Sequence, residues 1–237
     1  MLIKSFSEHG FHHAEMNQDN QDAVYYGNNK NFTVISLADG VSECLQARTG
    51  AEIASRASTN LLLKHGDLFM ELDNQKIAQI VISHVLYELR YVANRDSKKI
   101  EDYSSTLSCV LLDKRRNKIL CMNLGDAIIL ASDPGNCKVL TMPYDSSEGC
   151  CVTTTYNAYL ATVVNFFDTS SIDSVVICSD GAWKQMFQKN KLKYEVFALI
   201  AASKYDVLEQ FLRRQKCFDD FSFISLDMKQ SRKGKAA

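Results

Sequence analysis

Short apolar runs that stop at turn-forming residues are typical of buried strands. The first such run, FTVISLA at residues 32–38, ends at Asp39-Gly40. Comparable runs predict strands at 105–113, 118–126, 127–133, 137–142, 159–164, 174–180 and 221–228. The four runs between 105 and 142 are joined by short turns, at 114–117 and at the DPGN sequence of 133–136, so we expect them to form a meander of antiparallel hairpins.

Three other stretches carry apolar residues at helical spacing. Small and apolar residues from Ala47 to Leu62 predict a helix that ends at His65-Gly66 with a C-cap glycine. Apolar positions three and four residues apart predict an amphipathic helix over 75–93, with one face packed on a sheet. Residues 192–214 predict a helix interrupted near Lys204.

No repeat or linker divides these elements. The pattern therefore predicts a single domain over residues 1–228, followed by a basic tail at 229–237.

Composition limits the class of protein. The chain has 237 residues, of which 46% are hydrophobic and 23% charged, as in ordinary globular proteins. With 27 basic and 28 acidic residues, the formal charge is −1, so we expect neither nucleic acid nor an anionic membrane surface as a partner. No stretch approaches the roughly 18 apolar residues of a membrane span, and the N-terminus lacks the apolar segment of a Sec-type signal. We expect a soluble monomer.

The eight cysteines are scattered, without any CxxC pair, and several lie in apolar runs. Such thiols are typical of reduced, buried cysteines rather than of a disulfide framework. They favour a cytoplasmic location.

Two of the predicted strands end in the same dipeptide, Asp39-Gly40 and Asp180-Gly181. A lone Asp-Gly is typical of a hairpin turn or a helix N-cap, but no partner strand follows either glycine. A carboxylate at a strand end, beside a glycine whose carbonyl can approach closely, suits a hard cation.

Three further acidic positions fit the same purpose. They are Asp22 in the NQDA sequence of 20–23, Asp126 in NLGDA, and Asp219 in the FDDF sequence of 218–221. Each alone is typical of a turn or of solvated surface, but together and in this order they are specific.

With these motifs the chain resembles the metal-dependent protein phosphatases of the protein phosphatase 2C type over nearly its whole length. The resemblance implies an α+β fold, a four-layer αββα sandwich in which helices flank two antiparallel sheets. It also implies hydrolysis of phosphoserine and phosphothreonine in a phosphorylated protein substrate. The nucleophile would be a water activated by two Mn²⁺ or Mg²⁺ ions.

Site roles follow from the resemblance residue by residue. Asp39 resembles the carboxylate that bridges both metals, with Gly40 as a carbonyl ligand and Asp180 and Asp219 as further ligands. Asp22 is expected to act in catalysis by orienting the attacking water. Asp126 resembles the ligand of a weaker third metal.

The sequence departs from the better-known members at several positions. Gln21 stands where they have Glu, so we expect a weaker second metal ligand there. Asn17 stands where they have a phosphate-binding Arg, and Val41 where some have His. A variant branch carries a Gly-x-x-His element, matched here by Gly10 to His13, which favours His13 as a substitute phosphate ligand or proton donor. The alternative for His13 is a loop histidine with only a local hydrogen bond.

The segment between Asp126 and Asp180 also looks short, which suggests a trimmed flap over the cleft. For Trp183 we expect core packing. Two functions remain open: an active metal-dependent phosphatase, or a pseudophosphatase that keeps the fold as a regulatory binding module. A haloacid-dehalogenase-type phosphatase would need a DxD motif, which the chain lacks.

Overall fold

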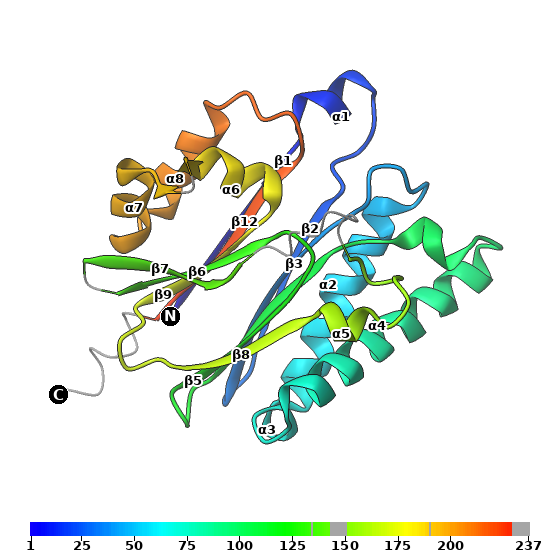
Figure 1. The fold of residues 1–237 in the computed structure, drawn as a ribbon, viewed down its shortest axis with the longest axis horizontal. Coiled ribbons are helices and arrows are strands. Elements are labelled where there is room, and N and C mark those ends of the chain that lie inside the picture. Colours follow the sequence, from blue (N-terminus) through cyan, green and yellow to red (C-terminus); the bar gives the residue numbers. More distant parts are fainter. Residues whose placement is uncertain (134, 143–150, 190, 229–237) are drawn as a thin grey trace.

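The computed structural model describes residues 1–133, 135–142, 151–189 and 191–228. Its centre consists of two five-stranded antiparallel sheets, one in the order β2-β3-β4-β5-β8 and the other in the order β1-β12-β9-β6-β7 (Figure 1). The expected basic tail at 229–237 lies outside the described residues, as do residues 143–150 of the stretch between Asp126 and Asp180 in which a trimmed flap is expected.

The first sheet is covered by the long helices of the N-terminal half. Its strands are β2 (Asp22–Asn28), β3 (Phe32–Asp39), β4 (Leu107–Asp113), β5 (Lys118–Leu124) and β8 (Val163–Asp168). The helical elements on this side are α2 (Ala47–Lys64), α3 (Gly66–Phe69), α4 (Asn74–Arg95), η1 (Ile100–Tyr103) and α5 (Ala158–Ala161). Figure 1 shows α2 and α4 running along this outer layer.

The second sheet carries the C-terminal helices. Its strands are β1 (Leu2–Glu8), β6 (Ile128–Asp133), β7 (Asn136–Thr141), β9 (Ser174–Cys178) and β12 (Phe221–Asp227). The helices on this side are the short N-terminal α1 (Phe11–Glu15), which follows β1, and the C-terminal α6 (Asp180–Met186), α7 (Tyr194–Ala201) and α8 (Tyr205–Arg213). A small hairpin joins β10 (Phe187–Gln188) to β11 (Lys191–Leu192).

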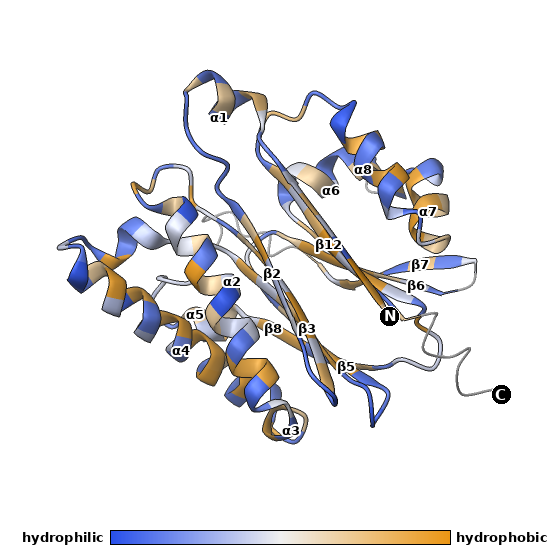
Figure 2. Cartoon of the chain, turned by 180° about the vertical axis from the view of Figure 1, so that it is seen from behind, coloured by the Kyte–Doolittle hydropathy of each residue, from blue (hydrophilic) through white to orange (hydrophobic). Residues whose placement is uncertain are grey.

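A core between the two sheets fixes their relative position. Ile35 and Leu37 of β3 belong to the same buried apolar cluster as Ile177 of β9 and Ile224 of β12. Separate clusters lie between each sheet and its helices. Central strands are therefore buried on both faces, which explains why β4 reads as a continuous apolar run rather than an alternating one. Figure 2 shows hydrophobic residues along two other central strands, β3 and β12. The expected four-layer αββα sandwich is confirmed.

Most of the predicted helices and strands are confirmed, but the meander is wrong. The pairs β4–β5 and β6–β7 are hairpins, whereas β5 and β6 belong to different sheets. The chain crosses between the sheets at Gly125, whose φ of 107° is readily available only to glycine. Periodicity marks strands but does not show which sheet a strand joins.

Local predictions also needed correction. Residues 158–161 form a helix, and the strand predicted over 159–164 begins only at Val163. Gly66 does not end α2 in a left-handed conformation; it opens α3, where a Cβ would lie 2.8 Å from the Phe32 ring. Strand β1 was missed because only Phe6 of its seven residues is fully buried.

The described cysteines are all free. Within the described residues, none of the helices combines the length and apolar character needed to cross a membrane.

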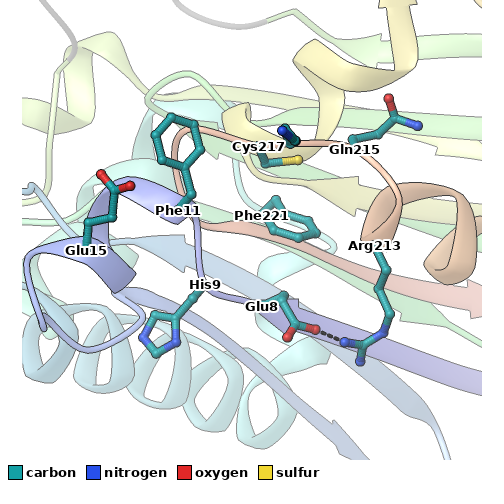
Figure 3. A pocket seen from close by; sticks show the side chains of 9 residues that line it. Glu8, His9, Phe11, Glu15, Arg213, Gln215, Cys217 and Phe221 are labelled. Carbon is teal, nitrogen blue, oxygen red and sulfur yellow. Dashed lines mark hydrogen bonds and ion pairs between the residues drawn. The ribbon is translucent and has the colours of Figure 1, made fainter.

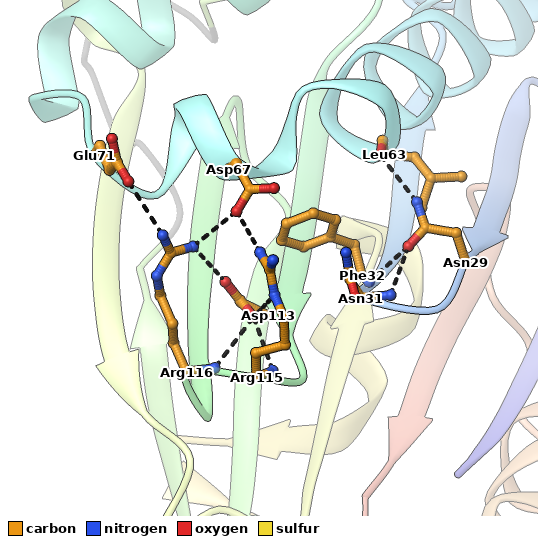
Figure 4. A network of polar contacts seen from close by, with 9 residues as sticks. All are labelled: Asn29, Asn31, Phe32, Leu63, Asp67, Glu71, Asp113, Arg115 and Arg116. Carbon is orange, nitrogen blue, oxygen red and sulfur yellow. Dashed lines mark hydrogen bonds and ion pairs between the residues drawn. The ribbon is translucent and has the colours of Figure 1, made fainter.

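A buried carboxylate anchors the β4–β5 turn (Figure 4). Asp113 is fully buried and accepts hydrogen bonds from the backbone N–H groups of Arg115 and Arg116, at 2.9 and 3.2 Å. The Arg116 guanidinium donates to its other oxygen at 2.8 Å and also to the exposed Asp67 at 3.1 Å. Burial opposes ionisation of Asp113, but these donors outweigh it and lower its pKa.

We predict that Asp113→Asn lowers the free energy of unfolding by about 2 kcal/mol at pH 7, because charge-assisted hydrogen bonds are lost. A depressed folded-state pKa stabilises above the unfolded value, and this contribution disappears as the pH falls through the folded value. The wild type and the variant should thus converge in acid. Urea unfolding at pH 7 and pH 3 checks this, with Asp67→Asn as the exposed control; equal losses for both variants would contradict it.

Candidate active site

The first sheet brings two acidic motifs side by side. In the β2–β3 pair, Asp22 lies directly opposite Asp39. The Gly40 N–H donates to the Gln21 carbonyl at 3.2 Å. Thr106 holds the backbone of Asp39 from the other side, because its N–H donates to the Asp39 carbonyl at 2.8 Å and its Oγ1 accepts from the Asp39 N–H at 3.0 Å. Both carboxylates therefore start from fixed backbone positions.

The second sheet meets this pair through Ser179. This residue follows β9 and precedes α6, and its Oγ donates to Asp22 Oδ2 at 2.9 Å. The same Oγ accepts from the Ser222 N–H of β12 at 2.9 Å. One hydroxyl thus links both sheets and orients Asp22.

Asp220 fixes the N-terminal segment to the start of β12. Its carboxylate accepts from the Gly10 N–H at 2.8 Å and from the Gln21 N–H at 2.6 Å. His13 Nδ1 lies 2.8 Å from Asp220 Oδ2, and both side chains are almost fully buried. Asp220 therefore positions the Gln21-Asp22 segment, while its neighbour Asp219 remains half-buried at the cleft.

Close backbone packing explains the glycines of the two Asp-Gly pairs. A Cβ at Gly181 would lie 2.1 Å from the Asp220 carbonyl oxygen, and a Cβ at Gly40 would lie 2.6 Å from the Ala47 backbone. Any larger residue would push apart the segments that carry Asp180, Asp219 and Asp39.

The carboxylates share one region, where burial and neighbouring charges raise the pKa of four of them. The pKa of Asp39 is well above its usual range, mainly because the carboxyl group is buried. The charges of four other residues raise it further: Asp22, Asp180, Asp219 and Asp126. Burial raises the pKa of Asp22 to about 8 against the opposing hydrogen bonds of its serine neighbours. The pKa values of Asp126 and Asp219 are also raised, by burial and then by Asp180. The structure thus gathers all five predicted carboxylates.

Buried oxygens in this region fit a cation. Gln21 Oε1, Asp22 Oδ1 and Asp180 Oδ1 are buried and have no hydrogen-bond partner among the described residues. Leaving such oxygens without a partner costs about 1–3 kcal/mol each, more when charged. An all-oxygen donor set suits Mg²⁺ or Mn²⁺. In the described part of the chain, no group of three or more His, Cys, Asp or Glu side chains is arranged to hold a metal as it stands.

Comparison with known proteins identifies the family. A model of the family described as protein phosphatase 2C matches residues 9–214. The chain belongs to the protein phosphatase 2C family. No curated protein sequence matches it.

Solved structures agree with this fold. The serine/threonine phosphatase Stp1 from Staphylococcus aureus has a TM-score of 0.67 and 18% identity, covering 96% of this chain and 95% of that one. The Mycobacterium tuberculosis serine/threonine phosphatase PstP/Ppp has a TM-score of 0.64 and 14% identity, covering 96% and 98%. RsbX in complex with magnesium has a TM-score of 0.55 and 12% identity, covering 94% and 92%. At these identities the likeness concerns the fold.

Two departures of this protein phosphatase 2C sequence now have structural explanations. Asn17 ends the α1 turn with φ of 52°, a left-handed conformation that asparagine tolerates better than most residues. His13 lies in α1 with its Nδ1 taken by Asp220, so a partner distant in sequence holds it.

Two hollows lie near the cleft. One, of about 400 Å³, lies beside Gln21 and is bordered by residues 42–49, which lead into α2 and include Arg48. The other, of about 600 Å³, lies around α1 (Figure 3). The second is lined by the ion-paired Glu8 and Arg213 and by Phe11. Neither hollow is lined by any of the five carboxylates, but the first borders Gln21, next to Asp22, so it fits better as an approach to the site.

Several positioning residues escaped the sequence analysis. Ser179 and Asp220 stand next to predicted ligands, where proximity in sequence alone assigns no role. Trp183 does more than pack, because its Nε1 donates to the Asp126 carbonyl at 2.8 Å. Lys184 places its ammonium 2.6 Å from Asp180 Oδ2. A signal was present only for Asp220, as the second acid of the Asp-Asp pair.

We predict that, in EDTA, stability falls as the pH rises from about 4 to 8. The folded-state pKa of Asp22 is about 8 against an ordinary 3.8, so the folded state binds more protons than the unfolded state in this interval. Asp22→Asn should flatten the dependence and be more stable than wild type at pH 8. Urea unfolding across this pH range tests it, with the exposed Asp206→Asn as control; parallel curves for wild type and Asp22→Asn would refute the assignment.

Proposed function

We propose that the protein is an active metal-dependent phosphatase that hydrolyses phosphoserine and phosphothreonine in proteins. The observation that carries this proposal is the convergence of Asp39, Asp180 and Asp219 with the unpartnered buried oxygens of Asp22 and Gln21. A purely structural region would not retain charges that raise each other's pKa.

The oxygen ligands available to two Mn²⁺ or Mg²⁺ ions are the carboxylates of Asp39, Asp180 and Asp219, the Gly40 carbonyl and, more weakly, the Gln21 amide. When bound, such ions supply hydroxide from water at neutral pH and neutralise the phosphate. The magnesium complex of the similarly folded RsbX supports this choice of metal.

The remaining side chains have positioning roles. Ser179 fixes Asp22 Oδ2, which leaves the buried Oδ1 to orient the attacking water. Asp220 and His13 hold Gln21 against the start of β12. His13 is only 3% exposed, which favours this indirect role over direct contact with the phosphate. The free thiols and near-zero net charge support a cytoplasmic monomer without nucleic-acid or membrane partners.

A regulatory pseudophosphatase is the second candidate. The neutral Gln21 and the absence of an arginine at position 17 favour it, because losing one donor to a developing oxyanion costs about 3–4 kcal/mol. Metal binding separates the candidates: a metal-free scaffold would not bind Mn²⁺ in the micromolar range.

We predict that Asp39→Ala and Asp180→Ala each lose about 100-fold or more in phosphatase activity, because even partners outside the ligand shell are worth 10- to 100-fold. Hydrolysis of p-nitrophenyl phosphate and of a phosphothreonine peptide with Mn²⁺ measures this. Asp206→Ala, an exposed acid paired with Lys4, is the matched control. Wild-type rates in the two cleft variants would disprove the assignment.

For His13 we predict a metal effect rather than a substrate effect. His13→Gln should raise the Mn²⁺ concentration needed for half-maximal activity, because Gln21 loses part of its support, while KM for p-nitrophenyl phosphate stays unchanged. Steady-state kinetics at varied Mn²⁺ and varied substrate separate the two. A raised KM at saturating Mn²⁺ would instead make His13 a phosphate ligand.

A further inference from the structure

The ammonium group of Lys184 lies among the cleft carboxylates. Lys184 stands one turn after Asp180 on α6, and its Nζ is 2.6 Å from Asp180 Oδ2. Burial alone would lower the pKa of Lys184, but the bond to Asp180 and the charges of Asp126 and Asp219 raise it overall. A lysine ammonium carries a positive charge at neutral pH.

The side chain of Lys184 is 57% exposed, but the helix that carries it is held in place. Trp183 joins α6 to the segment after β5 by donating to the Asp126 carbonyl at 2.8 Å. Gly181 packs directly on the Asp220 carbonyl. The start of α6 is thus attached on two sides, and Lys184 remains beside Asp126 as well as Asp180.

The two carboxylate oxygens of Asp180 differ in their contacts. Oδ2 accepts from Lys184, whereas Oδ1 is buried without a hydrogen-bond partner among the described residues. Lys184 thereby leaves one oxygen of Asp180 for a divalent ion and occupies the other.

The formal charges of the gathered residues agree with a role for Lys184 beside two divalent ions. Asp39 interacts with Asp22, Asp126, Asp180 and Asp219, which makes five carboxylates in all. Two divalent cations carry four positive charges, and the Lys184 ammonium supplies the fifth. Asp220 already has Gly10, His13 and Gln21 as its own donors. Before a phosphate binds, a further divalent ion would give this group of residues an excess of positive charge.

We propose that Lys184 is a resident cation that takes the place of one divalent ion beside Asp126 and Asp180. Asp126 is then an ion-pair neighbour of Lys184 and not the ligand of a third metal, which differs from the expectation drawn from the sequence resemblance. The inference rests on the proposed metal-dependent function, but it concerns how many ions bind.

Equilibrium dialysis of the full chain against Mn²⁺, followed by elemental analysis, counts the bound ions. We expect Lys184→Gln to bind one more Mn²⁺ per chain than wild type. Lys184→Arg, which keeps the charge, and Lys138→Gln, an exposed lysine on β7, should both match wild type. Asp126→Asn should leave the wild-type count unchanged and remove the additional ion from Lys184→Gln.

Each outcome decides between the alternatives. Equal counts in wild type and Lys184→Gln, or loss of an ion from Asp126→Asn alone, would overturn the role of Lys184. If wild type binds no Mn²⁺, the proposed function fails, while a gain of one ion in Lys184→Gln would still support the inference. Circular dichroism confirms that each variant is folded before ions are counted.

Discussion

Repulsion between carboxylates held at fixed backbone positions is the constraint on which the rest of this structure depends. The β2–β3 register places Asp22 opposite Asp39, and like charges directly opposite on neighbouring strands are destabilising. Burial adds to the cost, since both groups have raised pKa values. Such an arrangement persists only if the surrounding structure holds it and either bound protons or a cation offset the charge.

The surrounding structure holds it by bonds that cross between elements. Thr106, which directly precedes β4, binds the Asp39 backbone. Ser179 joins Asp22 to the second sheet, and Asp220 binds the N-terminal segment to the start of β12. Glycine at 181 permits the closest of these approaches. Thr106 acts on the Asp39 backbone and Asp220 on the Gln21 backbone, while Ser179 occupies one oxygen of Asp22. The Asp39 carboxylate and the other oxygen of Asp22 therefore stay available. The atoms that hold these residues in place are therefore different from the carboxylate oxygens that remain free to bind a ligand.

The ends of the strands could be predicted from the sequence, because an apolar run followed by Asp-Gly is a local pattern. The separation of β5 from β6 could not, since both read as strands and only packing assigns them to sheets. Asp39, Asp180 and Asp219 were found through their motifs. Ser179 was not, because its role depends on Asp22 in the other sheet. Lys184 was not, because its role depends on the helix turn that brings its side chain to Asp180.

Gln21 and Lys184 change the charge of this region in the same direction. Glutamine at 21 removes a negative charge that a glutamate would bring, and Lys184 adds a positive one beside Asp180. A cleft made less negative in this way needs fewer divalent ions for neutrality, so Gln21 need not be read as damage to a metal site. It is consistent with a centre adjusted to a smaller total charge, in which Lys184 provides permanently what a loosely held ion would provide only when bound.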